Sequence, residues 1–171
     1  MNTTNKILHN YKADFKSYLL KCYQSVAQKT KVTGIGVFTD ADMSNFVIYI
    51  NSKDHLTHRN AESTSRNEML TNKWWLPEWW WESNALEEGN LIDQLELIFK
   101  HLEFEIYKNT FFSIYCQVLE EIKKEINADN DIVFLVQVSD NFDVEDKQYL
   151  SNILDEEQWE EYLEFNNYWI G

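Results

Sequence analysis

Three aspartates follow segments predicted to be strands and could form a carboxylate cluster. Asp40 and Asp42 come after the apolar run that ends at Thr39, and Asp140 comes after a second run at 132–138. If the two strands are neighbours, the carboxylates converge at one edge of a sheet, where they could hold a divalent cation or act as general acid and base. Aspartate is also common in turns because it bonds its own backbone, so a purely structural role is the alternative.

Two histidines stand three residues apart in a polar segment. On a helix, His55 and His58 would share a face with Glu62 and offer nitrogen and oxygen ligands to a metal. No third histidine lies nearby in the sequence, and Arg59 places a positive charge beside the pair. The pattern therefore favours a solvated helix face, and we expect no cofactor and no tightly bound metal.

Five tryptophans fall within the eight positions from 74 to 81. Tryptophan is enriched both in protein cores and at the anchors of protein interfaces. Because so many rings are hard to bury in one short segment, we expect some of them to line a groove, with a satellite core and a sugar-stacking platform as alternatives. The residues predicted to bind a partner here are Trp74, Trp75, Glu78, Trp79, Trp80, Trp81 and Glu82.

The charge of the chain is strongly negative and unevenly distributed. Lys and Arg total 15 against 29 Asp and Glu, a net charge of −14, and ten carboxylates with one Lys lie between Asp140 and Glu164. Such a field repels nucleic acid and attracts cationic surfaces, so a basic protein is the expected partner. A solvated helix face is the alternative for this acidic region. The acidic residues predicted to contact the partner are Asp140, Asp143, Glu157, Glu160 and Glu161.

The composition predicts one folded domain spanning residues 1–171. With 44% hydrophobic residues, a chain of 171 residues can bury a sizeable core. The longest apolar stretches are far shorter than the ~20 residues of a membrane span, and no secretory signal opens the chain, so we expect a cytoplasmic protein with no membrane partner. Cys22 and Cys116 lie among apolar residues and are expected to be buried, reduced thiols.

Hydrophobic periodicity and capping residues indicate the helices. Apolar residues recur at three- and four-residue steps near both ends and in the middle of the chain. Asp155 and Gln158 have the spacing of a capping box at the start of the last helix. Helices are expected over Ile7–Val26, over Ser52–Leu70 as one largely solvated helix, from an Asn90 cap to a break at 109–110, over 111–126 with Lys123 and Lys124 at its end, and from Asp155 onward.

Three short segments are predicted to be strands. Gly34–Thr39 and Phe46–Asn51 are rich in β-branched and aromatic residues and flank a turn-forming cluster, which predicts an antiparallel hairpin. The run 132–138 is apolar apart from Gln137 and predicts a central strand of the same sheet as Val37. The expected fold class is therefore α+β, a single domain with a small, mainly antiparallel sheet packed with helices.

Three motifs occur in a defined order along the chain: a strand ending in Thr39-Asp40, the set Trp74, Glu78 and Trp79, and a late strand ending in Ser139-Asp140. Over nearly its whole length the chain resembles the bacterial domain-of-unknown-function family 4303. In that family a Trp, three residues, an acidic residue and a second Trp follow the first strand. The resemblance implies a fold but no established activity. Some relatives look like neighbours of secreted-toxin genes, which would imply an immunity protein.

Together these observations predict a non-enzymatic acidic binding protein, and specifically an immunity protein that neutralises a cognate bacterial toxin. The alternative is an enzyme of unknown reaction that uses Asp40, Asp42 and Asp140, with or without a metal. The residue patterns leave the oligomeric state and the identity of the partner open.

Overall fold

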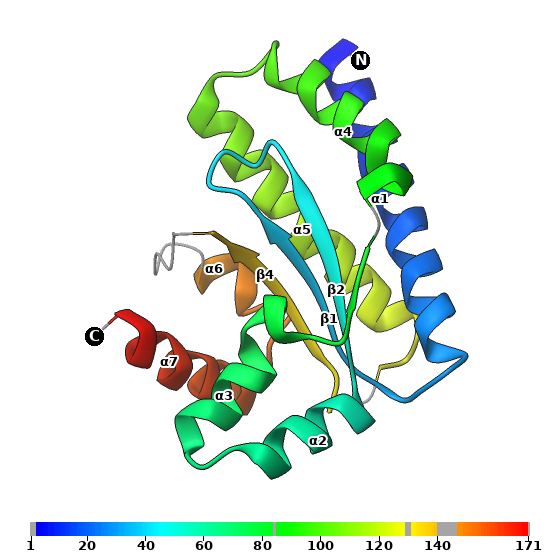
Figure 1. Ribbon diagram of the computed structural model, residues 1–171. Coiled ribbons are helices and arrows are strands. Elements are labelled where there is room, and N and C mark those ends of the chain that lie inside the picture. Colours follow the sequence, from blue (N-terminus) through cyan, green and yellow to red (C-terminus); the bar gives the residue numbers. More distant parts are fainter. Residues whose placement is uncertain (1–2, 84, 129–130, 140–146, 171) are drawn as a thin grey trace.

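A small four-stranded sheet lies at the centre of the fold, with helices on both of its faces (Figure 1). The computed structural model describes residues 3–83, 85–128, 131–139 and 147–170. The strands are β1 (Val32–Thr39), β2 (Phe46–Ser52), β3 (Trp81–Glu82) and β4 (Val133–Val138), in the order β3-β2-β1-β4. The helices are α1 (Thr3–Ala27), α2 (Lys53–Glu62), α3 (Arg66–Trp74), the 3-10 helix η1 (Leu76–Glu78), α4 (Ala85–Phe99), α5 (Phe104–Glu125), α6 (Lys147–Leu150) and α7 (Glu156–Ile170).

The predicted hairpin is confirmed, and so is the α+β class. β1 pairs antiparallel with β2, and β2 pairs antiparallel with β3, whereas β1 pairs parallel with β4, so the sheet is mixed. Val37 pairs with Val136, which confirms that the run 132–138 shares a sheet with the hairpin. β4 is not central, because it ends the strand order. It is nevertheless buried along its whole length, which explains its unbroken apolar pattern.

The prediction of one helix over 52–70 is wrong. The chain forms α2 and α3 with a break at 63–65, where Ser65 begins a new helix. The Ser65 side chain accepts a hydrogen bond from the Glu68 N–H, and the Glu68 carboxylate accepts one from the Ser65 N–H. This capping box satisfies backbone donors that a continuous helix would not expose, so it makes the break favourable.

The predicted boundaries of the next two helices also change. Asn90 lies inside α4 rather than at its cap, and the break falls between Phe99 and Phe104 rather than at 109–110. Residues 109–110 stay helical because the buried rings of Tyr107 and Phe111 on either side pack into the core, and such packing overrides weak helix propensity. The predicted C-terminal lysines of α5 are confirmed.

An aromatic core fills the space between α1, α5 and the sheet. Phe15 packs against Phe46 and Tyr115 at ring-centroid distances of 5.1 and 4.9 Å. The hydroxyls of Tyr11 and Tyr115 lie 3.1 Å apart, so two buried phenols satisfy one another. Cys22 and Cys116 are buried thiols, as the sequence predicts. Within the described residues, no helix is both long and apolar enough to cross a membrane.

The buried phenols predict a loss of stability in alkaline solution. Burial raises the pKa of Tyr11, Tyr107 and Tyr115 well above the usual value near 10. As the pH rises, these hydroxyls therefore ionise at a lower pH in the unfolded chain than in the folded protein. Their contribution to stability is complete below about pH 10 and is lost as the pH rises further. The urea midpoint should fall between about pH 8 and about pH 11, and should fall less in Tyr11→Phe. Ionisation of all nine tyrosines near pH 10 in the folded protein, followed by absorbance, would contradict this expectation.

Candidate partner-binding site

The tryptophan-rich segment packs directly on the sheet because two glycines of β1 make room for it. A Cβ atom built on Gly34 would lie 2.6 Å from the ring of Trp79, and one on Gly36 would lie 2.4 Å from the Leu76 side chain. Any larger residue at either position would push η1 away from the strand. The two glycines therefore set how closely the segment approaches the sheet.

A buried glutamine of β4 holds the same segment in register. The Gln137 side chain accepts a hydrogen bond from the Leu76 N–H and donates one to the Trp74 carbonyl, each at 3.3 Å. Gln137 is only 2% exposed. Its amide thus satisfies the first N–H of η1 and the last carbonyl of α3, which explains why one polar residue interrupts the apolar run of β4.

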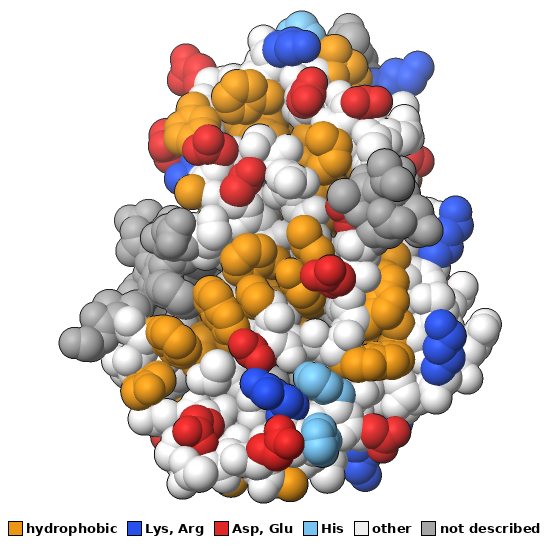
Figure 2. Space-filling model, in the orientation of Figure 1, with side chains coloured by type: hydrophobic (Ala, Val, Ile, Leu, Met, Phe, Trp, Pro, Cys, Tyr) orange, Lys and Arg blue, Asp and Glu red, His pale blue; other side chains and the backbone are white. Residues whose placement is uncertain are grey.

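Five aromatic rings from four parts of the chain form a continuous surface band, here called the aromatic strip. Its members are Tyr49 of β2, Phe38 of β1, Trp75 after α3, and Trp169 and Tyr168 of α7. Consecutive ring centroids in that order lie 6.3, 6.0, 6.0 and 5.7 Å apart. Figure 2 shows hydrophobic side chains gathered across this face, from the end of α7 to β2. A surface of this kind is typical of a protein interface.

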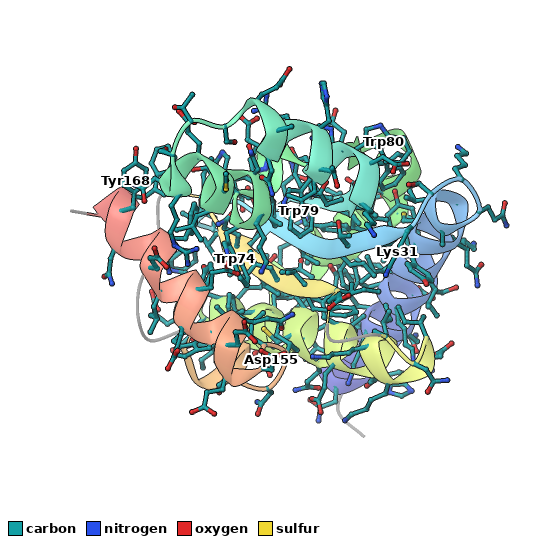
Figure 3. All side chains as sticks on the ribbon, turned by 90° about the horizontal axis from the view of Figure 1, so that it is seen from below. Lys31, Trp74, Trp79, Trp80, Asp155 and Tyr168 are labelled. Atoms are coloured by element: carbon teal, nitrogen blue, oxygen red, sulfur yellow. The ribbon has the colours of Figure 1, made fainter. Side chains whose placement is uncertain are left out.

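The burial of the tryptophans corrects part of the predicted site. Trp74 is fully buried and Trp79 is 6% exposed, so neither can contact a partner; both are core residues. In Figure 3 these two rings lie inside the fold, while Trp80 lies toward its outside. Trp75 and Trp81 are partly buried, and Trp80 is 45% exposed. The segment is therefore half core and half surface, since its rings alternate between the sheet and the solvent.

An acidic groove of about 430 Å³ adjoins the α7 end of the aromatic strip. Arg59 lies in it and is paired with Glu78 at 2.7 Å. A backbone hydrogen bond from Thr64 is the main cause that lowers the pKa of Glu68, which stays ionised as part of the α3 cap. With three carboxylates, one cation and two exposed rings, the groove suits an incoming cationic side chain. Its charged and aromatic lining residues are Arg59, Glu62, Glu68, Glu78, Tyr168 and Trp169.

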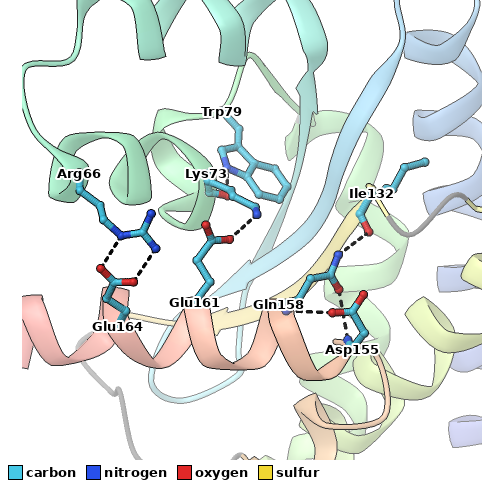
Figure 4. A network of polar contacts seen from close by, with 8 residues as sticks. All are labelled: Arg66, Lys73, Trp79, Ile132, Asp155, Gln158, Glu161 and Glu164. Carbon is cyan, nitrogen blue, oxygen red and sulfur yellow. Dashed lines mark hydrogen bonds and ion pairs between the residues drawn. The ribbon is translucent and has the colours of Figure 1, made fainter.

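The acidic residues of α7 divide into two sets. Glu161 forms an ion pair with Lys73, and both oxygens of Glu164 accept hydrogen bonds from Arg66 at 2.6 Å (Figure 4). These contacts hold α7 against α3, so Glu161 already has an ion-pair partner within the fold, and its contact with a protein partner stays a prediction. Glu157 and Glu160 are exposed and remain candidates. Asp140 and Asp143 lie outside the described residues.

The predicted capping box at the start of α7 is confirmed. The Gln158 N–H donates to the Asp155 carboxylate at 2.8 Å, and the Asp155 N–H donates to the Gln158 side chain at 3.3 Å. The Gln158 amide also donates to the Ile132 carbonyl at 3.5 Å (Figure 4). The cap therefore fixes the helix start and ties it to the chain just before β4.

The two histidines contact different partners. A ring nitrogen of His55 lies 3.0 Å from the Glu78 carbonyl oxygen, whereas His58 lies 3.5 Å from the carboxylate of Glu62. Across the described residues there is no group of three or more His, Cys, Asp or Glu side chains placed to hold a metal ion. The expectation that His55 and His58 hold no metal tightly stays a prediction.

For the predicted cluster of aspartates, the structure describes the two strand ends and the positions of Asp40 and Asp42. β1 and β4 are neighbours, and the Ser139 N–H donates to the Thr39 carbonyl at 2.8 Å, so the two strand ends do meet. The Asp40 carboxylate accepts hydrogen bonds from the backbone and the hydroxyl of Ser44, each at 2.8 Å, which is turn chemistry. Asp42 is exposed, and Asp140 lies outside the described residues.

Sequence reasoning missed four members of the aromatic strip. The sequence patterns place Phe38 and Tyr49 only in strands, and they place Tyr168 and Trp169 only in the last helix. A signal exists for Trp169, because it follows Tyr162 and Phe165 at helical spacing and extends their apolar face. Nothing in the local sequence, however, places Trp169 beside Trp75.

Comparison with known proteins identifies a family. A family model described as "Domain of unknown function (DUF4303)" matches residues 8–152. No curated protein and no solved structure matches the chain. The matched region contains the sheet and the tryptophan-rich segment but ends before α7, which supplies two rings of the aromatic strip.

Proposed function

Because the chain belongs to the DUF4303 family of domains of unknown function, we propose a function from its surface: it is a non-enzymatic protein that binds a basic protein partner. The observation that carries the proposal is the junction of the aromatic strip with the acidic groove. Tyr168 and Trp169 belong to both and are 53% and 51% exposed. Large rigid rings beside carboxylates match the anchors and the rim of a protein interface.

In this proposal, the negative charge and the aromatic rings affect different rate constants of binding. A net charge of −14 steers a cationic partner toward the protein, and steering acts mainly on the rate of association. Rings that are buried on binding act mainly on the rate of dissociation. Glu157 and Glu160, exposed on α7, belong to the steering field, and the exposed Trp80 extends the area available to a partner.

The partner that best fits this surface is a cationic bacterial toxin, so that the protein acts as its immunity protein in the cytoplasm. A nuclease or another enzyme with a basic cleft presents the charge that an acidic groove neutralises. A lysine or arginine of the toxin that inserts between Trp169 and the groove carboxylates would contact both the indole ring and the carboxylates. The same contact would block the basic cleft of the toxin.

The test is a pull-down with the product of the gene next to the one encoding this protein, followed by binding kinetics. We expect Trp169→Ala to cost about 2 kcal/mol or more of binding, mainly through faster dissociation. The double reversal Glu157→Lys and Glu160→Lys should slow association, and the difference from the unmodified protein should shrink at high salt. Glu161 is left unchanged because it holds α7 against α3.

Phe104→Ala is the matched control, because Phe104 is an exposed ring (41%) at the start of α5, outside the strip. It should leave both rates unchanged. Absence of a complex, or a complex that responds equally to Trp169→Ala and Phe104→Ala, would refute the proposal.

A further inference from the structure

A second cavity, of about 490 Å³, lies between α2, α3 and the ends of strands β1, β2 and β4. α2 contains no buried residue, so its inner face lines this space instead of filling a core. Each helix contributes residues at spacings of three and four, which lie on one helical face. These residues are Lys53, Leu56, Thr57 and Asn60 from α2, and Arg66, Met69, Leu70 and Lys73 from α3.

The cavity gathers positive charge in a strongly acidic protein. Four of the 15 Lys and Arg line it, against two carboxylates. Arg66 and Lys73 are neutralised by α7, as described above. Lys31 and Lys53 form no ion pair in the part of the chain that the structure describes. Two cations without an ion-pair partner therefore remain at the cavity, and the Asp131 carboxylate in its lining offsets only one of them.

The backbone holds these two lysines side by side. The Lys53 N–H donates to the Lys31 carbonyl at 2.8 Å, which joins the chain before β1 to the start of α2. Figure 3 looks toward this end of the sheet and labels Lys31. Both side chains are exposed, so their ammonium groups are available to a ligand at the cavity mouth.

A β-bulge adds a hydroxyl to the same place. Val32 pairs with Ser52 and Gly34 pairs with Asn51, so Thr33 has no partner residue in β2. Bulges redirect a side chain, and Thr33 lines the cavity. Its buried Oγ1 has no hydrogen-bond partner in the described structure, so it can still donate one hydrogen bond and accept others.

We propose that this cavity binds a small organic phosphate. Lys31, Lys53 and the Thr33 hydroxyl hold the phosphate group, and Leu56, Leu70 and Val133 receive the apolar body of the ligand. A phosphate monoester carries nearly two negative charges at neutral pH, which matches two unpaired lysines. The volume lies in the range of small-molecule sites, and the negative field of the rest of the protein disfavours a polyanion. This site is independent of the protein partner proposed above.

Phenyl phosphate is the probe, because it joins a phosphate to an apolar ring. In titration calorimetry we expect Lys31→Met and Lys53→Met each to weaken its binding at least about tenfold, since each removes one charge-assisted contact. Lys21→Met, a change at an exposed lysine of α1, should leave the affinity unchanged. Inorganic phosphate and phenol, which each carry half of the probe, should bind at least about tenfold more weakly than phenyl phosphate.

Amide chemical shifts give a second readout that does not depend on affinity. Phenyl phosphate should move the amide signals of Thr33, Asn51 and Thr57, and thermal melts should show that all the lysine variants stay folded. The proposal is overturned if about 10 mM phenyl phosphate produces neither heat nor shifts. It is also overturned if a variant that carries both Lys31→Met and Lys53→Met binds phenyl phosphate as well as the unmodified protein does, or if inorganic phosphate binds as tightly as phenyl phosphate.

Discussion

Replacement of Trp74 by alanine is expected to lower the free energy of unfolding by about 3–5 kcal/mol, the usual cost of deleting a fully buried large aromatic side chain. Trp74 is 0% exposed, and its ring packs against Tyr162 of α7 at a centroid distance of 5.4 Å. Its indole N–H has no hydrogen-bond partner in the described structure, so the loss comes from packing and from the cavity left behind. Urea denaturation followed by circular dichroism measures the change.

Trp80→Ala is the control for this experiment. Trp80 belongs to the same short segment but is 45% exposed, so its truncation should change the stability by no more than about 0.5 kcal/mol. Equal effects of the two substitutions would show that Trp74 does not lie in the core. The assignment of Trp74 to the core and of Trp80 to the surface would then be wrong.

A single methyl group on Gly34 is expected to destabilise the fold by about 1–3 kcal/mol, the range for overpacking in a core. The added Cβ would lie 2.6 Å from the Trp79 ring, which is rigid and cannot bend away as an alkyl chain can. The indole of Trp79 also donates to the Lys73 carbonyl at 3.2 Å, so movement of the ring would strain a hydrogen bond as well.

Gly89→Ala is the matched control, because a Cβ built on Gly89 would have no atom within 4 Å apart from its chain neighbours and the backbone of its own helix. Gly89 lies in α4, and an exposed alanine there should stabilise the helix by about 0.5–1 kcal/mol relative to glycine. Opposite signs for the two Gly→Ala substitutions, measured by thermal and urea denaturation, are the expected result. A neutral Gly34→Ala would mean that Trp79 does not sit on β1.

Much of the fold could be predicted because its signals are local. Strand patterns and turn residues are encoded within a few positions, which is why the sequence predicts both the hairpin and the strand at 132–138. The capping box of Asp155 and Gln158 is equally local, and the apolar surroundings of Cys22 and Cys116 indicated their burial. Helix boundaries were less predictable, since the break after Glu62 depends on whether Ser65 and Glu68 cap a new helix or remain inside one.

The candidate site was less predictable, because it is formed by contacts between residues that are far apart in the sequence. The sequence determined that the protein is acidic, rich in tryptophan and built around a hairpin with an added strand. Only the tertiary structure decided which tryptophans are buried, because Gly34 and Gly36 leave room for Trp79 and Leu76 on one face of β1. It also placed Trp169 against Trp75. The physical reason is that periodicity reports which face of an element is apolar, whereas the partner of that face is chosen by packing across the whole chain.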